Sequence, residues 1–219
     1  MAVTARPSTS SEALAALVEG NRRFVADQPA HPNQDAARRR SSAGTGQRPF
    51  AVVLGCSDSR VAAEIVFDQG LGDLFVVRTA GHLAGTDVLA SVEFGVTVLG
   101  APLVVVLGHD NCGAITAALT AHDTGTLPPG FLRTIVERIG PEVLAAHSAG
   151  ITDRDAIGQL HVEHTAEMLL QRSALLTDAV TSHHAAIVAM TYQLDNGRVH
   201  LVAQHGDALT AALAENTIT

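Results

Sequence analysis

The sequence contains no lysine, so all fourteen of its basic residues are arginines. A chain without lysine cannot form a lysine Schiff base, use a lysine general base or bind nucleotide phosphates through a P-loop lysine. Tryptophan is also absent, and aromatic residues make up 3% of the chain. No site in this protein can therefore depend on an amine side chain or on an indole.

Other features are scarce or missing. The chain has two cysteines, too few for a disulfide framework, and its first residues lack the apolar core of a signal peptide. No apolar run approaches the roughly 18 residues that a membrane helix needs. The net charge is −8, and the one basic run, Arg38–Arg40, is short, which argues against a nucleic-acid partner. We expect a cytoplasmic protein that binds neither membranes nor nucleic acids.

The pattern of apolar residues predicts an α/β fold with a mostly parallel central sheet flanked by helices. Short runs rich in β-branched residues cover residues 50–54, 74–77 and 103–107, as is typical of strands buried on both faces. Helical spacing follows the second and third runs, over residues 87–99 and 113–121. Strands that alternate with helices indicate an α/β protein.

The rest of the chain completes one structural domain. The expected elements are a helix over 11–26, a polar segment over 27–48 with a helical turn near 36–40, helices over 131–149 and 159–170, and two strands over 185–194 and 198–203. We divide the chain into an N-terminal helical arm, residues 1–48, and a catalytic α/β domain, residues 49–219.

Two loops that each follow a predicted strand carry the residues best suited to chemistry. Cys56 lies in GCSDSR, and His109 and Cys112 lie in GHDNCG. Because the carboxyl ends of parallel strands form the ligand-binding crevice, we expect these side chains to converge. Two thiolates and an imidazole suit Zn²⁺ and leave a fourth position open, as in catalytic zinc sites. A redox-active dithiol and two inert buried cysteines remain open as alternatives.

Asp58 and Arg60 lie beside Cys56 and add charge to the same loop. The Asp58 carboxylate can occupy the fourth zinc position, or it can pair with the planar guanidinium of Arg60 and orient a zinc-bound hydroxide. A structural ion pair at a helix start is the third interpretation. Because two thiolates neutralise the metal, hydroxide forms less readily than on zinc held by imidazoles, and we expect an alkaline activity optimum.

Four segments together make the sequence resemble the β-class carbonic anhydrases. These segments are Glu19–Phe24, Cys56–Arg60, Phe75–Gly81 and Gly108–Gly113. The family catalyses the reversible hydration of CO2 to bicarbonate and a proton by a zinc-bound hydroxide. The resemblance implies one Zn²⁺ per chain on Cys56, His109 and Cys112, with Asp58 as a further ligand when the site closes. In the open site it implies that Asp58 and Arg60 act as a catalytic pair.

The resemblance also implies a substrate pocket and an oligomer. The residues at the pocket positions of the family are Gln47, Phe75, Ala80, Phe94 and Gly113. The family is built on a homodimer in which N-terminal helices embrace the partner, and dimers often pair into homotetramers. The polar segment over 27–48 fits such an arm, and Gln47, Phe75 and Phe94 could then be shared across the interface.

The sequence leaves two other functions open and contains one further cluster of histidines. A carbonyl sulfide or carbon disulfide hydrolase of the same fold is one alternative, and a nonenzymatic zinc protein with Asp58 permanently on the metal is the other. His161, His164 and Glu167 lie three residues apart in a predicted helix, so they share its surface. Such residues are mostly solvent-exposed, and we predict no second metal site there.

Overall fold

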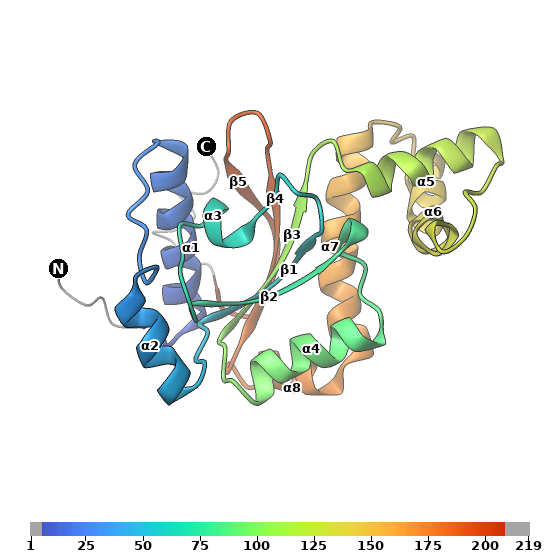
Figure 1. The fold of residues 1–219 in the computed structure, drawn as a ribbon. Coiled ribbons are helices and arrows are strands. Elements are labelled where there is room, and N and C mark those ends of the chain that lie inside the picture. The colour runs from blue at the N-terminus through green and yellow to red at the C-terminus, as the bar shows by residue number, and fades with distance from the viewer. Residues whose placement is uncertain (1–5, 209–219) are drawn as a thin grey trace.

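The structure is a computed structural model that describes residues 6–208. The ends of the predicted arm and of the predicted catalytic domain, residues 1–5 and 209–219, lie outside the described residues. A five-stranded sheet with the order β2-β1-β3-β4-β5 forms the centre of the molecule (Figure 1). Its strands are β1 Ala51–Cys56, β2 Leu74–Thr79, β3 Leu103–His109, β4 Ala186–Tyr192 and β5 Val199–His205.

The first four strands are parallel, and β5 pairs antiparallel with β4. The predicted α/β fold with a mostly parallel sheet is therefore confirmed. The described helices are α1 Ser10–Val25, α2 Ala36–Thr45, α3 Ala63–Val66, α4 Thr86–Thr97, α5 Gly113–Thr124, α6 Leu132–Ser148, α7 Arg154–Arg172 and α8 Ala174–Thr181, with a 3-10 turn, η1, at Ala80–His82. No helix of residues 6–208 has the length and hydrophobicity required to cross a bilayer.

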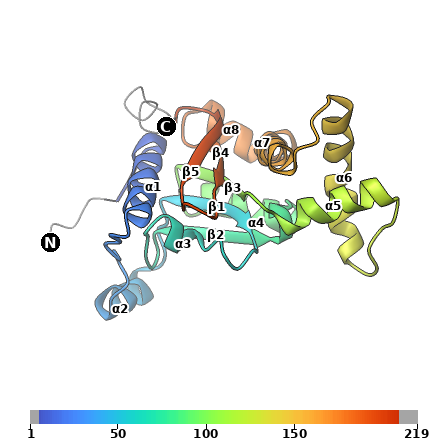
Figure 2. The ribbon, with the colours of Figure 1, turned by 90° about the horizontal axis from the view of Figure 1, so that it is seen from above.

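Helices cover both faces of the sheet. Helices α1 and α3 pack against one face, and α4, α7 and α8 pack against the other (Figures 1 and 2). Successive strand residues point to opposite faces. Val53 and Val105 therefore belong to the cluster with α1 and α3, whereas Val52 and Val104 belong to the cluster with α4, α7 and α8. Because strands buried on both faces need apolar residues at every position, the runs in β1 and β3 are continuous.

The first helix belongs to the same core as the sheet. Leu14 and Leu17 are fully buried in the cluster that covers one sheet face. Asn21 is buried too, and its side-chain amide donates to the carbonyls of Val66 (3.1 Å) and Gly197 (2.8 Å). At Gly20, any Cβ would lie 1.8 Å from the Phe67 carbonyl oxygen, so only glycine permits this close packing. The Glu19–Phe24 segment therefore fixes α1 onto α3 and the strand connections.

Helices α5 and α6 form a hairpin that projects from the sheet on the side away from α1 (Figure 2). A third apolar cluster lies at its base, where Ile139 and Val143 of α6 and Ile157 of α7 are fully buried. Cys56 and Cys112 belong to this cluster. The packing of the hairpin against the carboxyl edge of the sheet thus encloses the two thiols.

Candidate metal centre

The two cysteines and the histidine converge at the carboxyl edge of the sheet. Cys56 ends β1, His109 ends the neighbouring strand β3, and Cys112 is the N-cap residue of α5. Their ligand atoms all lie within 4.8 Å of one another, and all three residues are buried. Within residues 6–208 no other group of three or more histidine, cysteine or acidic residues has such geometry. The predicted convergence is confirmed.

The protonation of His109 is set by its neighbours. Its Nδ1 lies 2.7 Å from the carbonyl oxygen of Asp110, and because a carbonyl only accepts, Nδ1 carries the proton and donates. The lone pair is then on Nε2, which is buried and has no oxygen or nitrogen hydrogen-bond partner among residues 6–208. A buried imidazole lone pair next to two thiols fits a metal ion that accepts nitrogen and sulfur ligands.

The two thiols do not ionise equally. A hydrogen bond from Cys112 lowers the pKa of Cys56 to about 4, with burial opposing the shift and His109 adding to it. The same hydrogen bond, together with burial, raises the pKa of Cys112, although the amides of Ile115 and Ala114 at the start of α5 oppose that rise. The pair therefore ionises in two separate steps. A divalent cation is what allows both sulfurs to be thiolates, and this donor set is a zinc site.

Arg60 holds the Asp58 carboxylate through both of its oxygens. Its Nε lies 2.9 Å from Oδ1 and a terminal nitrogen lies 2.7 Å from Oδ2, while the Arg60 backbone amide also donates to Oδ1 (2.9 Å). These hydrogen bonds hold the pKa of Asp58 well below its usual value. The free side of Oδ2 lies 4.0 Å from Nε2 of His109, so the carboxylate borders the metal cluster without joining it.

Residues outside the predicted set hold the loop after β1. Arg78, near the end of β2, donates to the carbonyl of Cys56 (2.9 Å) and to that of Asp58 (2.6 Å). Because these two carbonyls flank Ser57, the guanidinium fixes the backbone between the thiol and the carboxylate. Arg78 is the one charged residue of β2, which makes it stand out in the sequence, but the sequence does not show which carbonyls it contacts.

The loop after β3 is held from α7. The Asn111 backbone amide donates to Asp155 (2.9 Å), and Arg154 donates to the Asn111 side chain (2.5 Å). Asp110 accepts a hydrogen bond from the backbone amide of Leu194 (3.0 Å). No sequence signal marks Arg154 or Asp155, because they contact the loop only through the tertiary fold.

The predicted substrate residues are divided between two ends of the sheet. Ala80 and Gly113 lie next to the cysteines, in η1 and at the start of α5. Phe75 instead pairs with Val52 near the start of β1, whereas Thr79 pairs with Cys56. Four residues of strand span about 13 Å, so a single chain does not bring Phe75 to the metal cluster. The ring of Phe94 contacts that of Phe75, with centroids 6.1 Å apart, so Phe94 lies at the same end of the sheet.

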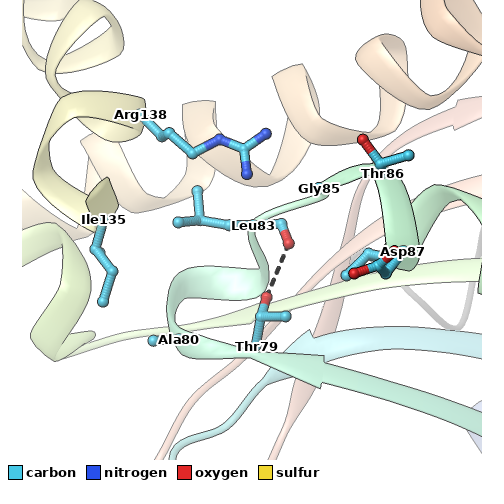
Figure 3. Close-up of a pocket in the computed structure, with 9 residues that line it drawn as sticks. Thr79, Ala80, Leu83, Gly85, Thr86, Asp87, Ile135 and Arg138 are labelled. Atoms are coloured by element: carbon cyan, nitrogen blue, oxygen red, sulfur yellow. Dashed lines mark hydrogen bonds between the residues drawn. The ribbon is translucent and has the colours of Figure 1, made fainter. Parts of the chain in front are cut away.

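Gln47 is exposed, and it lines a separate hollow with residues of α2 and with Leu71, Gly72 and Leu74. The pocket that includes Ala80 has a volume of about 330 Å³ and lies between η1 and α6. Figure 3 shows Ile135 and Arg138 of α6 on one side of it and Thr79 and Ala80 on the other. Its walls near η1 are mostly apolar, which suits a small uncharged molecule.

Comparisons with known proteins identify relatives that cover most of the chain. The sequence profile described as carbonic anhydrase matches residues 51–199. Carbonic anhydrase 2 of Mycobacterium tuberculosis is 54% identical over 186 residues, which cover 85% of this chain and 89% of the relative. The carbonic anhydrase of Mycolicibacterium smegmatis is 53% identical over 192 residues, covering 88% of this chain and 93% of the relative.

Solved structures share the fold at lower sequence identity. A tetrameric β-carbonic anhydrase of the ascomycete Sordaria macrospora has a TM-score of 0.70 and 20% identity, with 88% of this chain and 98% of that chain covered. The β-carbonic anhydrase of Coccomyxa, solved with acetazolamide, has a TM-score of 0.68 and 24% identity, with 88% of each chain covered.

Proposed function

This chain belongs to the carbonic anhydrase family and has the fold of its β class, and from this premise we propose how its own residues hydrate CO2. Cys56, His109 and Cys112 form the zinc site. When bound there, zinc would lower the pKa of a water molecule and so supply the nucleophile. The observation that carries the proposal is the pairing of this donor set with a carboxylate, Asp58, whose two oxygens are fixed by Arg60.

Asp58 acts as a hydrogen-bond acceptor that orients the nucleophile. Its lowered pKa keeps it ionised, so it accepts protons in hydrogen bonds and does not donate them. Arg60 is the positioning residue, because its planar fork holds the carboxylate in one orientation. Both Asp58 oxygens are engaged by Arg60, and closure of the site by Asp58 at low pH requires these hydrogen bonds to break.

The apolar residues around Ala80 provide the surroundings for CO2. Leu83 and Ile135 line the pocket beside Ala80 and have no polar side-chain atoms. CO2 has no net charge, so an apolar wall holds it without competing for the nucleophile. Bicarbonate, the charged product, is bound less well by such a wall and leaves it for water.

A second copy of the chain completes the pocket in this proposal. Phe75, Phe94 and Gln47 lie away from the metal cluster of their own chain, and Phe94 is 43% exposed. An exposed aromatic ring, Phe94, packed against a half-buried one on the edge strand β2, Phe75, suits a subunit interface. The relative from Sordaria macrospora is tetrameric, which supports an assembly of dimers.

Two substitutions test the chemistry directly. Cys112→Ser removes a ligand, so bound zinc and CO2 hydration should both be lost. Asp58→Asn keeps the shape and the metal but loses the charge that Arg60 holds, so turnover should fall by about 10- to 100-fold with zinc retained. Stopped-flow CO2 hydration and metal analysis on the same samples measure both effects.

The control is Asp123→Asn, whose side chain is 67% exposed on α5 and which should behave as the wild type. Full turnover of Asp58→Asn would contradict the role given to the carboxylate. Assays of carbonyl sulfide and carbon disulfide beside CO2 test the hydrolase alternative. Bound zinc without CO2 hydration from pH 6 to 9 would instead favour the nonenzymatic alternative.

A further inference from the structure

The turn η1 packs directly on the metal centre. Gly81 lies in the left-handed region, with φ 65° and ψ 27°. A Cβ at this position would lie 2.8 Å from the Cβ of Ala114, in the first turn of α5, so the absence of a side chain lets η1 reach the cluster. The Gly81 amide is among the backbone groups that lower the pKa of the Cys56 thiol. One backbone group of Gly81 therefore faces a metal ligand.

The other backbone group of Gly81 is held by His161 of α7. Nε2 of His161 lies 2.9 Å from the Gly81 carbonyl oxygen, and because a carbonyl only accepts, Nε2 carries the proton and donates. His161 is 3% exposed, so our expectation that this helix histidine is solvent-exposed is wrong. Helix α7 comes this close because Gly108 of β3 leaves room for Val162.

Glu142 fixes the orientation of the His161 ring. The Glu142 carboxylate, on α6, hydrogen-bonds to Nδ1 of His161. The ring also packs at a tilt against His82, the last residue of η1, with centroids 4.5 Å apart. His161 is thus held by a carboxylate on one side and holds η1 on the other. This chain of contacts resembles the hydrogen bonds that orient metal ligands from outside the ligand set and tune the metal site.

We propose that His161 is a positioning residue for the metal centre, because it holds Gly81 so that the Gly81 amide stays directed at the sulfur of Cys56. An N–H donor at a thiolate withdraws electron density from it and limits its motion, so its loss alters both the metal affinity and the sulfur-to-metal charge transfer. This role rests on the proposed function, in which Cys56 binds the metal.

His164 provides a matched control on the same helix. It lies one turn beyond His161, is 55% exposed at its side chain and lies 3.9 Å from the same Glu142 carboxylate. It has no contact with Gly81 among the interactions of residues 6–208 that involve that glycine. Substituting it changes the charge near Glu142 without removing the hydrogen bond to η1.

The test compares His161→Leu, His161→Gln and His164→Gln. His161→Leu should bind Zn²⁺ about tenfold more weakly in a chelator competition. The cobalt-substituted protein should show a shifted thiolate-to-Co²⁺ absorption band. Glutamine has an amide N–H that can replace the ring donor, so His161→Gln should recover most of both properties. His164→Gln should match the wild type in both.

A folded His161→Leu protein with wild-type zinc affinity and an unchanged cobalt spectrum would overturn the proposal. Equal changes in His161→Leu and His164→Gln would overturn it too, because only His161 contacts η1. If His161→Leu does not fold, Glu142→Gln takes its place, and it should shift both readouts in the same direction by less. A wild type that binds no Zn²⁺ would instead refute the metal site itself.

Discussion

At the scale of single residues, η1 can pack closely against α5 because residue 81 is a glycine. Gly81 combines a left-handed backbone with a contact that leaves no space for Cβ. Gly100 has nearly the same φ, 66°, but a Cβ there would meet no atom within 4 Å. The two glycines therefore separate the effect of backbone strain from the effect of crowding.

We predict that Gly81→Ala destabilises the fold by about 2–5 kcal/mol, since the left-handed strain of about 1–2 kcal/mol adds to overpacking of about 1–3 kcal/mol. Gly100→Ala should lose only the strain, about 1–2 kcal/mol. Urea unfolding of both variants gives the comparison. Equal losses would show that η1 moves aside without resistance.

The ligands at this scale were predictable, but their supports were not. Cys56, His109 and Cys112 each follow an apolar strand, and the edge at which parallel strands end can be inferred from the sequence. Arg78 donates to the backbone carbonyls of Cys56 and Asp58. Every residue has a backbone carbonyl, so no residue type in the sequence marks these two as its partners. Asp155 contacts Asn111 only because α7 lies beside β3.

At the scale of elements, the segment between α1 and α2 is fastened by a buried carboxylate. Asp68 follows α3, and its side chain is 1% exposed. It accepts hydrogen bonds from the backbone amides of Ala30 (2.9 Å) and His31 (3.0 Å) and from Nε of Arg23 (2.6 Å). Burial raises the pKa of Asp68, but these donors together lower it more, so the pKa is below its usual value.

The pH dependence of stability follows from this shift. Since the pKa of Asp68 is lower in the folded state than the unfolded value of about 3.9, its contribution is present above about pH 4 and is lost as the pH falls toward the folded pKa. Asp68→Asn should destabilise the protein by about 1–3 kcal/mol at pH 7 and flatten the loss of stability between pH 5 and pH 3.

Urea unfolding at pH 7, 5 and 3.5 measures this difference. Asparagine tolerates the positive φ of 45° at this position, so the substitution changes the charge without adding backbone strain. The exposed Asp123→Asn variant is the reference for losing one negative charge. Parallel pH profiles for Asp68→Asn and the wild type would refute the assignment.

The elements themselves were predictable where burial set the pattern. The apolar runs of β1, β2 and β3 and the helices α1, α4, α5 and α6 were expected close to their observed bounds, although the edge strand β2 is half-buried rather than buried on both faces. Helix α2 extends to Thr45, beyond the predicted turn, but it buries no residue, so no apolar pattern marks it. Helix α8 was not predicted, because Ser173 ends α7 and also caps α8, leaving no loop between the two helices.

At the scale of the whole molecule, one side of the sheet exposes apolar side chains beside its edge strand β2. Phe94 is 43% exposed and Val98 is 64% exposed, both at the end of α4. Phe75 lies next to Phe94 on β2. The sequence alone could not place this pair, because the register of β2 against β1 decides which end of the sheet carries Phe75.

We predict that Phe94→Asp dissociates the oligomer and lowers CO2 turnover while zinc stays bound. An aromatic side chain at the centre of an interface commonly contributes about 2 kcal/mol or more, and a carboxylate in its place is unfavourable when buried. Light scattering, CO2 hydration and metal analysis on one preparation measure the three properties. Phe94→Leu should remain assembled, and a monomeric wild type with full turnover would contradict a shared pocket.

Two donors of the zinc site, Cys56 and His109, end adjoining strands whose connection includes β2, η1 and α4, and the third, Cys112, caps α5 just after β3. They meet only when β1 and β3 have paired, so the ion cannot nucleate this fold as it does in a zinc finger. Loading of the metal therefore follows the pairing of these two strands. We expect a metal-free chain that has already folded to become active when zinc is supplied, without new synthesis.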